Sequence, residues 1–379
     1  MKRLRIGFDG RYIHDRYHGI GRYSFNLLEA LTRLQPEKHF VVFRGKDGDT
    51  RFDWDKLSGR TNVEFTPGPK NMYYPIEQLE WLRILKRSCI DVFHSPSFIA
   101  PLLADPRMPV IVTVHDLIFD RNPKDMPNSW AYPYYRLMMK RSLSRAKQII
   151  AVSKSTARDL HQYYRLSSEK LLLAPEGVDA VFRVPRSPDE LSSTLHEYQI
   201  RSPFILAVGA HRPHKNFNRL VEAFSRLPPE VIHQLVIVGS PDPRFRNDAP
   251  ALAIARNLDG RARFIDWVKE DDLPAIYKSA DMVVLPSIIE GFGLPALEAM
   301  ASGTLVLAAN NSSFPEILAD TGILFNPFDV DQITQAIKFA LEKPERSKQL
   351  REAGLIRSHE FTWDRTAEII YPLYDELLS

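Results

Sequence analysis

Two carboxylates, Glu290 and Glu298, stand with seven residues between them in the stretch EGFGLPALE. An apolar run precedes the first carboxylate, two glycines permit a tight turn, and Pro295 suits the first turn of a helix. Backbone amides at such a helix start bind anions, and a carboxylate there can accept two hydrogen bonds from a vicinal diol such as a ribose. The stretch therefore predicts a site for phosphate and sugar hydroxyls. For Glu298, a structural role favoured by the helix dipole stays open as the alternative.

A second polar stretch, GAHRPHKN at residues 209–216, also lies between an apolar run and a helical pattern. Arg212, with its planar guanidinium, and Lys215, as a point charge, could neutralise a diphosphate beside a helix start. The alternative is that both are ordinary exposed loop cations. His211 and His214 do not predict a metal site, because no carboxylate or cysteine ligand stands at a matching spacing.

In the first half of the chain, His115 and Asp116 directly follow the apolar run VIVTV. A histidine at the end of a strand can donate a hydrogen bond to a substrate hydroxyl or, when charged, to an anionic oxygen. A structural histidine is the alternative.

A short glycine-containing stretch, Gly19-Ile-Gly21-Arg-Tyr23, follows the first apolar run and opens a helical pattern. Its glycines allow the backbone to approach a phosphate or a second substrate closely. It does not match the dinucleotide-binding fingerprint, because position 24 is a serine and no acid follows at the required distance of about 20 residues.

These polar stretches are separated by short β-branched and aliphatic runs that alternate with helical patterns, as in parallel sheets covered by helices. We expect strands at residues 4–9, 39–43, 63–66, 91–94, 110–115, 148–153 and 171–174, then 204–209, 234–239, 263–266, 282–286, 304–309 and 322–325. We expect helices at about 21–34, 76–88, 129–146, 154–164, 216–227, 271–279, 294–302 and 331–342.

The alternation stops between Pro175 and Pro203, a proline-rich segment that suits an interdomain connection with a short helix inside it. We therefore expect an α/β fold of two doubly wound domains, residues 1–180 and 181–360, whose strand ends face a central cleft. Residues 361–379 predict a terminal helix capped by Thr362 and kinked at Pro372.

Cys89 is the only cysteine, which excludes an intrachain disulfide and a cysteine-rich metal site and suits a reducing compartment. We expect its thiol to be buried and inert. The first residues, MKRLRIGFDGRY, lack the apolar core of a signal peptide, and no apolar run approaches the ~18 residues needed to span a bilayer. The composition therefore predicts a cytoplasmic protein that is soluble or peripheral to a membrane.

The net charge of +3 hides an asymmetry, because residues 1–180 carry +9 and the remainder carries −6. Segment 136–170 alone holds nine basic residues and two acidic ones, and aromatic residues precede it at Trp130, Tyr132, Tyr134 and Tyr135. An anionic membrane surface is one partner that such a segment could meet, and a solvated helix face is the alternative. Nucleic acid is not expected, because no basic motif interleaved with aromatics lies on one recognisable element.

Over nearly its whole length the sequence resembles glycosyltransferase family 4, the retaining transferases of GT-B architecture. The glutamate pair, with the family's seven-residue spacing, is the most specific point of resemblance. Supporting points are the Gly19–Tyr23 stretch, the His115-Asp116 pair, Pro175-Glu-Gly-Val-Asp179, the loop with Arg212 and Lys215, the Pro315-Glu316 turn and the closing helix.

The resemblance implies two Rossmann-like domains, with the terminal helix crossing back onto the first. In the donor domain it implies that Arg212 and Lys215 hold the diphosphate and that Glu298 holds the ribose. Glu290 would contact sugar hydroxyls on the reacting face. The amides of Phe292 and Gly293 would belong to the same donor loop.

In the first domain the resemblance implies a hydrogen bond from His115 to the donor sugar and a place for Gly21 near the phosphates. Gly19, Tyr23 and Asp116 would lie on the acceptor side. Many family members have an arginine directly after the glycine that corresponds to Gly209, whereas this chain has Ala210. Arg212 is the plausible substitute.

The function implied is transfer of mannose, glucose or a relative from a GDP- or UDP-linked donor to a glycan or lipid-linked acceptor, as in polysaccharide biosynthesis. The catalytic set would be His115, Glu290, Lys215 and Arg212, and no metal or other cofactor would be needed. A sugar-nucleotide epimerase and a catalytically silent nucleotide-sugar-binding subunit remain alternatives.

Overall fold

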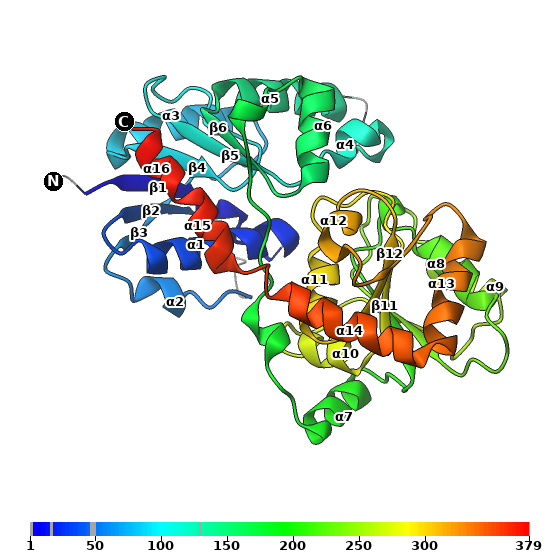
Figure 1. Cartoon of the computed structure of the whole chain (residues 1–379). Coiled ribbons are helices and arrows are strands. Elements are labelled where there is room, and N and C mark those ends of the chain that lie inside the picture. The colour runs from blue at the N-terminus through cyan, green and yellow to red at the C-terminus, as the bar shows by residue number, and fades with distance from the viewer. Residues whose placement is uncertain (1–2, 16–17, 46–50, 127, 129, 379) are drawn as a thin grey trace. The chain divides into compact units, whose positions relative to one another are not determined.

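The structure is a computed structural model that describes residues 3–15, 18–45, 51–126, 128 and 130–378 (Figure 1). The chain folds into two compact units. The first comprises residues 1–177 together with 362–379, and the second comprises 178–361. The boundaries expected from the sequence were 180/181 and 360/361.

The first unit is built on a seven-stranded, fully parallel sheet in the order β3-β2-β1-β4-β5-β6-β7. Each of its strands coincides with a run expected from the sequence, because strands of a parallel sheet that helices cover are rich in β-branched and aliphatic residues. The strands are β1 (Arg5–Asp9), β2 (His39–Arg44), β3 (Val63–Pro67), β4 (Val92–Ser95), β5 (Val110–Val114), β6 (Gln148–Ala151) and β7 (Leu171–Leu173).

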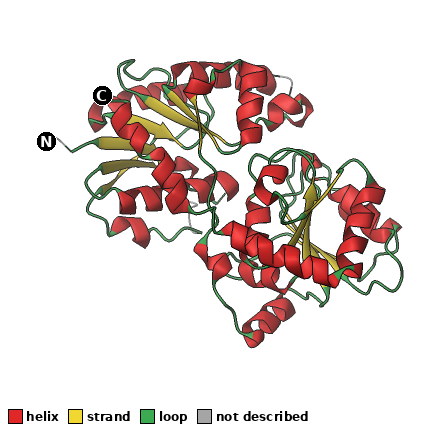
Figure 2. Cartoon of the chain, viewed as in Figure 1, coloured by secondary structure: helices red, strands yellow, loops and turns green. Residues whose placement is uncertain are grey.

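Helices cover both faces of this sheet (Figures 1 and 2). One face packs against α3 and α5 through a core that includes Trp81, Phe93, Val112 and Met139. The described helices are α1 (His18–Leu34), α2 (Asp55–Ser58), α3 (Ile76–Ser88), α4 (Ile118–Arg121), α5 (Ala131–Arg145) and α6 (Lys154–Tyr164), with 3-10 turns η1 (Gly10–Tyr12), η2 (Pro123–Asp125) and η3 (Ser168–Lys170).

The end of the chain belongs to the first unit, as the family resemblance implied. It forms α15 (Trp363–Ile370) and α16 (Pro372–Glu376), which break at Tyr371 as the proline predicts. The side chain of Thr362 caps α15 by accepting from the backbone N–H of Arg365. Helix α15 packs against α1, and the Tyr374 hydroxyl lies 2.8 Å from Nδ1 of His94 in β4.

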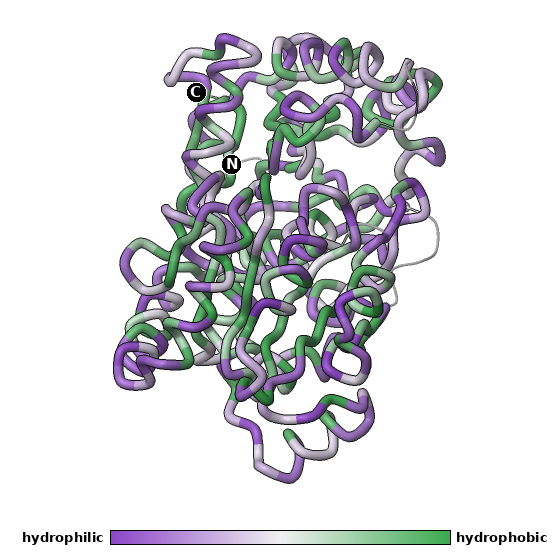
Figure 3. The backbone as a smooth tube through the Cα atoms, turned by 90° about the vertical axis from the view of Figure 1, so that its right-hand side faces the viewer, coloured by the Kyte–Doolittle hydropathy of each residue, from purple (hydrophilic) through white to green (hydrophobic). Residues whose placement is uncertain are grey.

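The second unit holds a six-stranded parallel sheet in the order β10-β9-β8-β11-β12-β13. Its strands also match the expected runs. The tube in Figure 3, coloured by hydropathy, shows hydrophobic green stretches between hydrophilic purple ones along the chain. The strands are β8 (Phe204–Val208), β9 (Gln234–Val238), β10 (Ala262–Ile265), β11 (Met282–Leu285), β12 (Leu305–Ala309) and β13 (Ile323–Phe325).

Helices α8, α9 and α13 lie on one side of the second sheet, and α10, α11 and α14 lie on the other (Figure 1). Helix α14 was not expected, because its sequence is mostly polar and only one large apolar side chain, Leu350, is buried among its residues. The described helices are α7 (Pro188–Glu197), α8 (Phe217–Ser225), α9 (Ala249–Ala255), α10 (Leu273–Ser279), α11 (Leu294–Ala301), α12 (Phe314–Leu318), α13 (Val330–Glu342) and α14 (Pro344–Ser358), with 3-10 turns η4 (Ala180–Arg183) and η5 (Pro213–Lys215).

Three local expectations were wrong. Cys89 is exposed rather than buried, because it ends α3 in the left-handed conformation. The helix expected from about residue 21 already begins at His18, so the whole Gly19–Tyr23 stretch lies within α1. The Pro315-Glu316 turn belongs to the short helix α12.

Among the described residues, no helix is long and apolar enough to cross a membrane.

Candidate active site

The second sheet reverses its strand order between β8 and β11, its two neighbouring central strands. In doubly wound sheets, ligands bind beyond the carboxyl ends of the strands at this switch point. The loop after β8 carries Arg212 and Lys215, and the loop after β11 carries Glu290. The fold therefore brings the two polar stretches of this half of the sequence to one place.

Lys215 and Glu290 form a direct ion pair across these two loops. The Lys215 ammonium donates to both carboxylate oxygens of Glu290, at 2.8 and 3.1 Å, and each side chain is only 15% exposed. Gly209 makes room for this lysine, because a Cβ there would lie 3.2 Å from its Cε and the backbone φ is +152°. The pair combines a cation able to bind a diphosphate with a carboxylate able to bind sugar hydroxyls.

Arg212 lies in the same loop but has a different partner. Its Nε donates to the Asp242 carboxylate at 3.0 Å, and its side chain is 39% exposed. Arg244 also pairs with Asp242, and these contacts lower the pKa of that carboxyl group. Burial, together with the charges of Lys215 and Arg212, lowers the pKa of His214 to about 3. The loop is thus a region of positive potential with a buried neutral histidine inside it.

The Glu290 backbone is held in place by the segment after β12. Its N–H donates to the Ser312 hydroxyl at 3.0 Å, and that hydroxyl donates to the Glu290 carbonyl at 2.8 Å. Asn311 donates its side-chain amide to the Ile288 carbonyl, and the Ile288 N–H donates to the His214 carbonyl. These contacts connect both loops and reduce the freedom of the Glu290 carboxylate.

Glu298 lies inside α11 and is 3% exposed. One of its carboxylate oxygens accepts a 2.8 Å hydrogen bond from the hydroxyl of Tyr277, a fully buried residue of α10. Gly293 is the N-cap residue of α11, and the Phe292 side chain is buried with its ring edge against Phe361. The predicted donor loop thus ends at the helix that carries Glu298.

In the first unit, His115 follows β5 and sits between two hydrogen-bond acceptors. Its Nδ1 is 2.9 Å from the Glu176 carboxylate and its Nε2 is 2.9 Å from the Pro96 carbonyl oxygen. Burial lowers the pKa of the imidazole, but the hydrogen bond and charge of Glu176, together with Pro96 and Asp116, outweigh it and raise that pKa. The contact with Glu176 therefore favours the protonated form of the imidazole, against the effect of burial.

The other predicted residues of this unit surround His115 or lie in α1. Tyr23 is fully buried, its ring centroid is 4.7 Å from that of His115 in an edge-to-face arrangement, and its hydroxyl forms a hydrogen bond with Thr113. Asp116 accepts a hydrogen bond from the N–H of Ile118, the first residue of the short helix α4. Gly21 approaches the Tyr12 carbonyl closely, whereas nothing lies within 4 Å of a Cβ built at Gly19.

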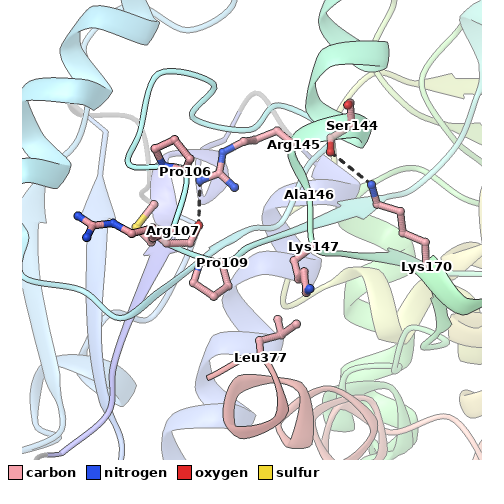
Figure 4. A pocket seen from close by; sticks show the side chains of 10 residues that line it. Pro106, Arg107, Pro109, Ser144, Arg145, Ala146, Lys147, Lys170 and Leu377 are labelled. Atoms are coloured by element: carbon pink, nitrogen blue, oxygen red, sulfur yellow. Dashed lines mark hydrogen bonds between the residues drawn. The ribbon is translucent and has the colours of Figure 1, made fainter. Parts of the chain in front are cut away.

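The basic segment 136–170 contributes residues to the lining of a hollow of about 500 Å³ (Figure 4). The hollow lies at the amino ends of β5, β6 and β7. Four cations line it, and two of them bond main-chain carbonyls. Arg145 donates to the Asp105 and Met108 carbonyls, and Lys170 donates to the Leu143 carbonyl. Arg107 and Lys147 complete the cationic lining. None of the predicted catalytic residues lines this hollow.

Four residues with clear contacts to the predicted site were missed from the sequence: Asp242, Tyr277, Ser312 and Glu176. The first three are ordinary polar or aromatic residues with no local spacing signal, because each reaches its partner through the tertiary fold. Glu176 lies in the Pro175–Asp179 stretch that carried the resemblance, but nothing in its neighbourhood indicated a contact with His115.

Within the part of the chain that the structure describes, no group of three or more His, Cys, Asp or Glu side chains could hold a metal ion.

Comparison with protein families gives two matches that cover most of the two units. A model described as "Glycosyltransferase Family 4" matches residues 17–182, and one described as "Glycosyl transferases group 1" matches residues 196–357. The first match contains His115 and Glu176, and the second contains Lys215, Glu290 and Glu298.

Individual relatives agree with these families. "O-antigen chain mannosyltransferase B" of Escherichia coli is 28% identical over 362 residues, which are 91% of this chain and 93% of that protein. "Serotype-specific mannosyltransferase WbdA" of Escherichia coli is 30% identical over 76% of this chain, and the match spans only 36% of that protein. Among solved structures, sucrose-phosphate synthase from Thermosynechococcus elongatus superposes with a TM-score of 0.78 at 21% identity, covering 99% of both chains.

Proposed function

Because the chain belongs to glycosyltransferase family 4, with the two Rossmann-like units of the GT-B fold, we propose that it transfers mannose from a nucleoside-diphosphate donor with retention of anomeric configuration. The names of the curated relatives support mannose over glucose as the sugar. The proposed acceptor is a hydroxyl of a glycan or of a lipid-linked saccharide, since two of those names refer to O-antigen chains.

The ion pair between Lys215 and Glu290 carries this proposal. The pair brings a largely buried cation and a largely buried carboxylate together at the switch point of the second sheet, and ligands of doubly wound sheets bind at such points. The two side chains pair with each other in the structure. A bound diphosphate would draw the ammonium towards itself and leave the Glu290 carboxylate to accept hydrogen bonds from sugar hydroxyls.

The charges that develop during transfer assign the roles. Cleavage of the bond between the anomeric carbon and the diphosphate leaves negative charge on the phosphate and oxocarbenium character on the sugar. Lys215 and Arg212 stabilise the first charge, and Glu290 favours the second through its field. The acceptor attacks from the face that the diphosphate leaves, and the leaving phosphate takes the acceptor proton. Glu290 in this scheme is not a nucleophile.

Glu298 binds the ribose diol in the proposed complex. Its carboxylate is oriented by the Tyr277 hydroxyl at 2.8 Å, which fixes one oxygen before the nucleotide arrives. The donor is GDP- or UDP-linked, and the proposed reaction requires no metal, because Lys215 and Arg212 supply the positive charge.

We also propose that the first unit contacts an anionic membrane surface reversibly. Three basic residues of this unit are exposed: Lys140, Arg141 and Lys147. Two apolar residues close to them in the sequence are also exposed, Trp130 at 82% and Leu137 at 51%. Each basic residue close to anionic lipid contributes about 1 kcal/mol, within the range of a Debye length. This surface would bring the enzyme to a lipid-linked acceptor.

A panel of nucleotide sugars tests the function. The melting temperature is measured with GDP-mannose, UDP-glucose, UDP-galactose and the free diphosphates, and donors that stabilise the protein are then incubated with candidate acceptors for product analysis. Stabilisation by GDP-mannose and an α-mannosyl product are expected. Conversion of the donor into another nucleotide sugar would identify an epimerase instead, and stabilisation without turnover for any acceptor would favour a silent binding subunit.

A further inference from the structure

His115 is placed so that its imidazole faces an acceptor on each side. A carboxylate and a main-chain carbonyl oxygen accept hydrogen bonds but cannot donate them. The two ring nitrogens are both 2.9 Å from such oxygens, those of Glu176 and Pro96. A neutral imidazole has one N–H and could satisfy only one of these contacts. The arrangement as a whole is satisfied by an imidazolium beside a Glu176 carboxylate.

Glu176 is itself held by the end of the chain. The Thr366 hydroxyl of α15 donates to the Pro175 carbonyl at 2.6 Å. On its other side, Gly177 lies so close to the start of α15 that a Cβ would be 2.3 Å from the Trp363 nitrogen. Glu176 is 4% exposed between these two contacts. The terminal helix therefore determines where the Glu176 carboxylate lies.

We propose that Glu176 is a positioning residue that keeps His115 as an oriented imidazolium, so that this ring presents positive charge to the donor's phosphate or sugar oxygen. The proposal rests on the donor-binding role proposed for His115. When a donor binds, its oxygen would replace the Pro96 carbonyl as the partner of Nε2, while Glu176 keeps Nδ1. The terminal helix thereby acquires a chemical role in addition to its packing.

The groups around the ring are consistent with this charge state. Asp116, the next residue, adds negative charge and raises the pKa of His115 further. Tyr23 of α1 turns its ring edge to the imidazole, and burial raises the pKa of its phenol so that it stays neutral. From α6, the Thr156 hydroxyl donates to the His115 carbonyl oxygen and carries no charge.

The test measures the protonation of His115 directly by NMR of protein labelled with ¹⁵N-histidine, with the signal assigned through His115→Gln. In the native protein both ring nitrogens should show imidazolium shifts at pH 7.5, where a histidine of ordinary pKa is only about 10% protonated. In Glu176→Gln the ring should become neutral at that pH and titrate below 6.5, because burial then dominates. Glu169→Gln, an exposed glutamate of the same unit, is the matched control and should leave the titration unchanged.

A second readout separates positioning from general folding support. Glu176→Gln should keep the native melting temperature within a few degrees and weaken binding of GDP-mannose by roughly tenfold at pH 7.5, with affinity recovering as the pH falls and His115 is protonated. A neutral His115 in the native protein, or identical titrations in the native and Glu176→Gln proteins, would overturn the inference. Failure of the native protein to bind any nucleotide sugar would contradict the proposed function while leaving the NMR result intact.

Discussion

The ammonium of Lys215 donates to both carboxylate oxygens of Glu290, although 75 residues separate the two in sequence. The two loops meet because β8 and β11 are neighbours in the sheet. In the proposed mechanism, Lys215 stabilises the leaving diphosphate and Glu290 contacts the reacting sugar. It therefore provides the most direct test of the donor site.

Replacement of either member of this pair should damage turnover more than folding. In Lys215→Ala, loss of the charge that stabilises the leaving phosphate should lower kcat/KM by on the order of 10² or more. Glu290→Gln should leave the melting temperature nearly unchanged and lower kcat. Lys348→Ala, an exposed lysine of the same unit, serves as the control and should behave as the native protein. Normal transfer by Glu290→Gln would contradict the active-site assignment.

Donor binding should not depend on a metal ion. Because the proposed site supplies its own cations, a nucleoside diphosphate should raise the melting temperature equally in EDTA and in magnesium. Differential scanning fluorimetry under both conditions measures this. Loss of the stabilisation in EDTA would show that the diphosphate needs a cation that Lys215 and Arg212 do not provide.

Tyr277 should affect only the part of donor affinity that depends on the ribose. Tyr277→Phe removes the hydroxyl that orients Glu298, and the affinity for a nucleoside diphosphate should fall by roughly tenfold, or about 1.4 kcal/mol. Affinity for the 2′,3′-dideoxy analogue should not change. Tyr198→Phe removes a similar hydroxyl, one that bonds Asp272, and should leave both affinities intact. Equal losses for both nucleotides in Tyr277→Phe would assign Tyr277 a purely structural role.

Membrane binding should require the exposed cations of the first unit. In vesicle sedimentation, the protein should bind anionic but not neutral lipid, and binding should weaken with added salt. Replacement of Lys140, Arg141 and Lys147 by glutamate should abolish it. Arg145 is left intact because it bonds two main-chain carbonyls. The matched control replaces Lys343, Arg346 and Lys348 of the second unit, and equal losses in both triple variants would argue against a specific surface.

Stability should fall in acid because of His94, a fully buried residue of β4 that contacts the Tyr374 hydroxyl of α16. Burial lowers the pKa of His94 to about 3 from its ordinary value of 6.5. Below pH 6.5 the unfolded chain therefore binds a proton at His94 that the folded chain does not bind. The free energy of unfolding falls by about 2 kcal/mol at pH 5 for this reason. The raised pKa of His115 has the opposite effect on stability, because the folded chain binds this proton more tightly than the unfolded chain and is stabilised as the pH falls.

Urea denaturation at pH 8 and pH 5 measures this difference. His94→Gln should show a smaller loss between the two pH values than the native protein does. An unchanged loss in the variant would assign the acid sensitivity to other groups, such as the buried His214.

The strands could be read from the sequence because most are short β-branched and aliphatic runs, a property of the local residues alone. Helices with an apolar stripe, such as α3 and α6, were also predictable from their period. Helix α14 was not, since its buried positions are mostly small or polar residues, Ser347, Gly354 and Ser358. Cys89 could not be placed either, because its exposure depends on the left-handed turn that ends α3.

The sequence by itself determined the kinds of chemical group at each strand end, and with them the family, the fold and the residues proposed for donor binding. Only the tertiary structure decided which of these groups meet. Lys215 pairs with Glu290, Glu298 with Tyr277, and His115 with Glu176. The physical reason is that hydrophobic periodicity and turn residues act locally, whereas these polar contacts join positions distant in sequence that become neighbours only when the strands have taken their order in the sheets.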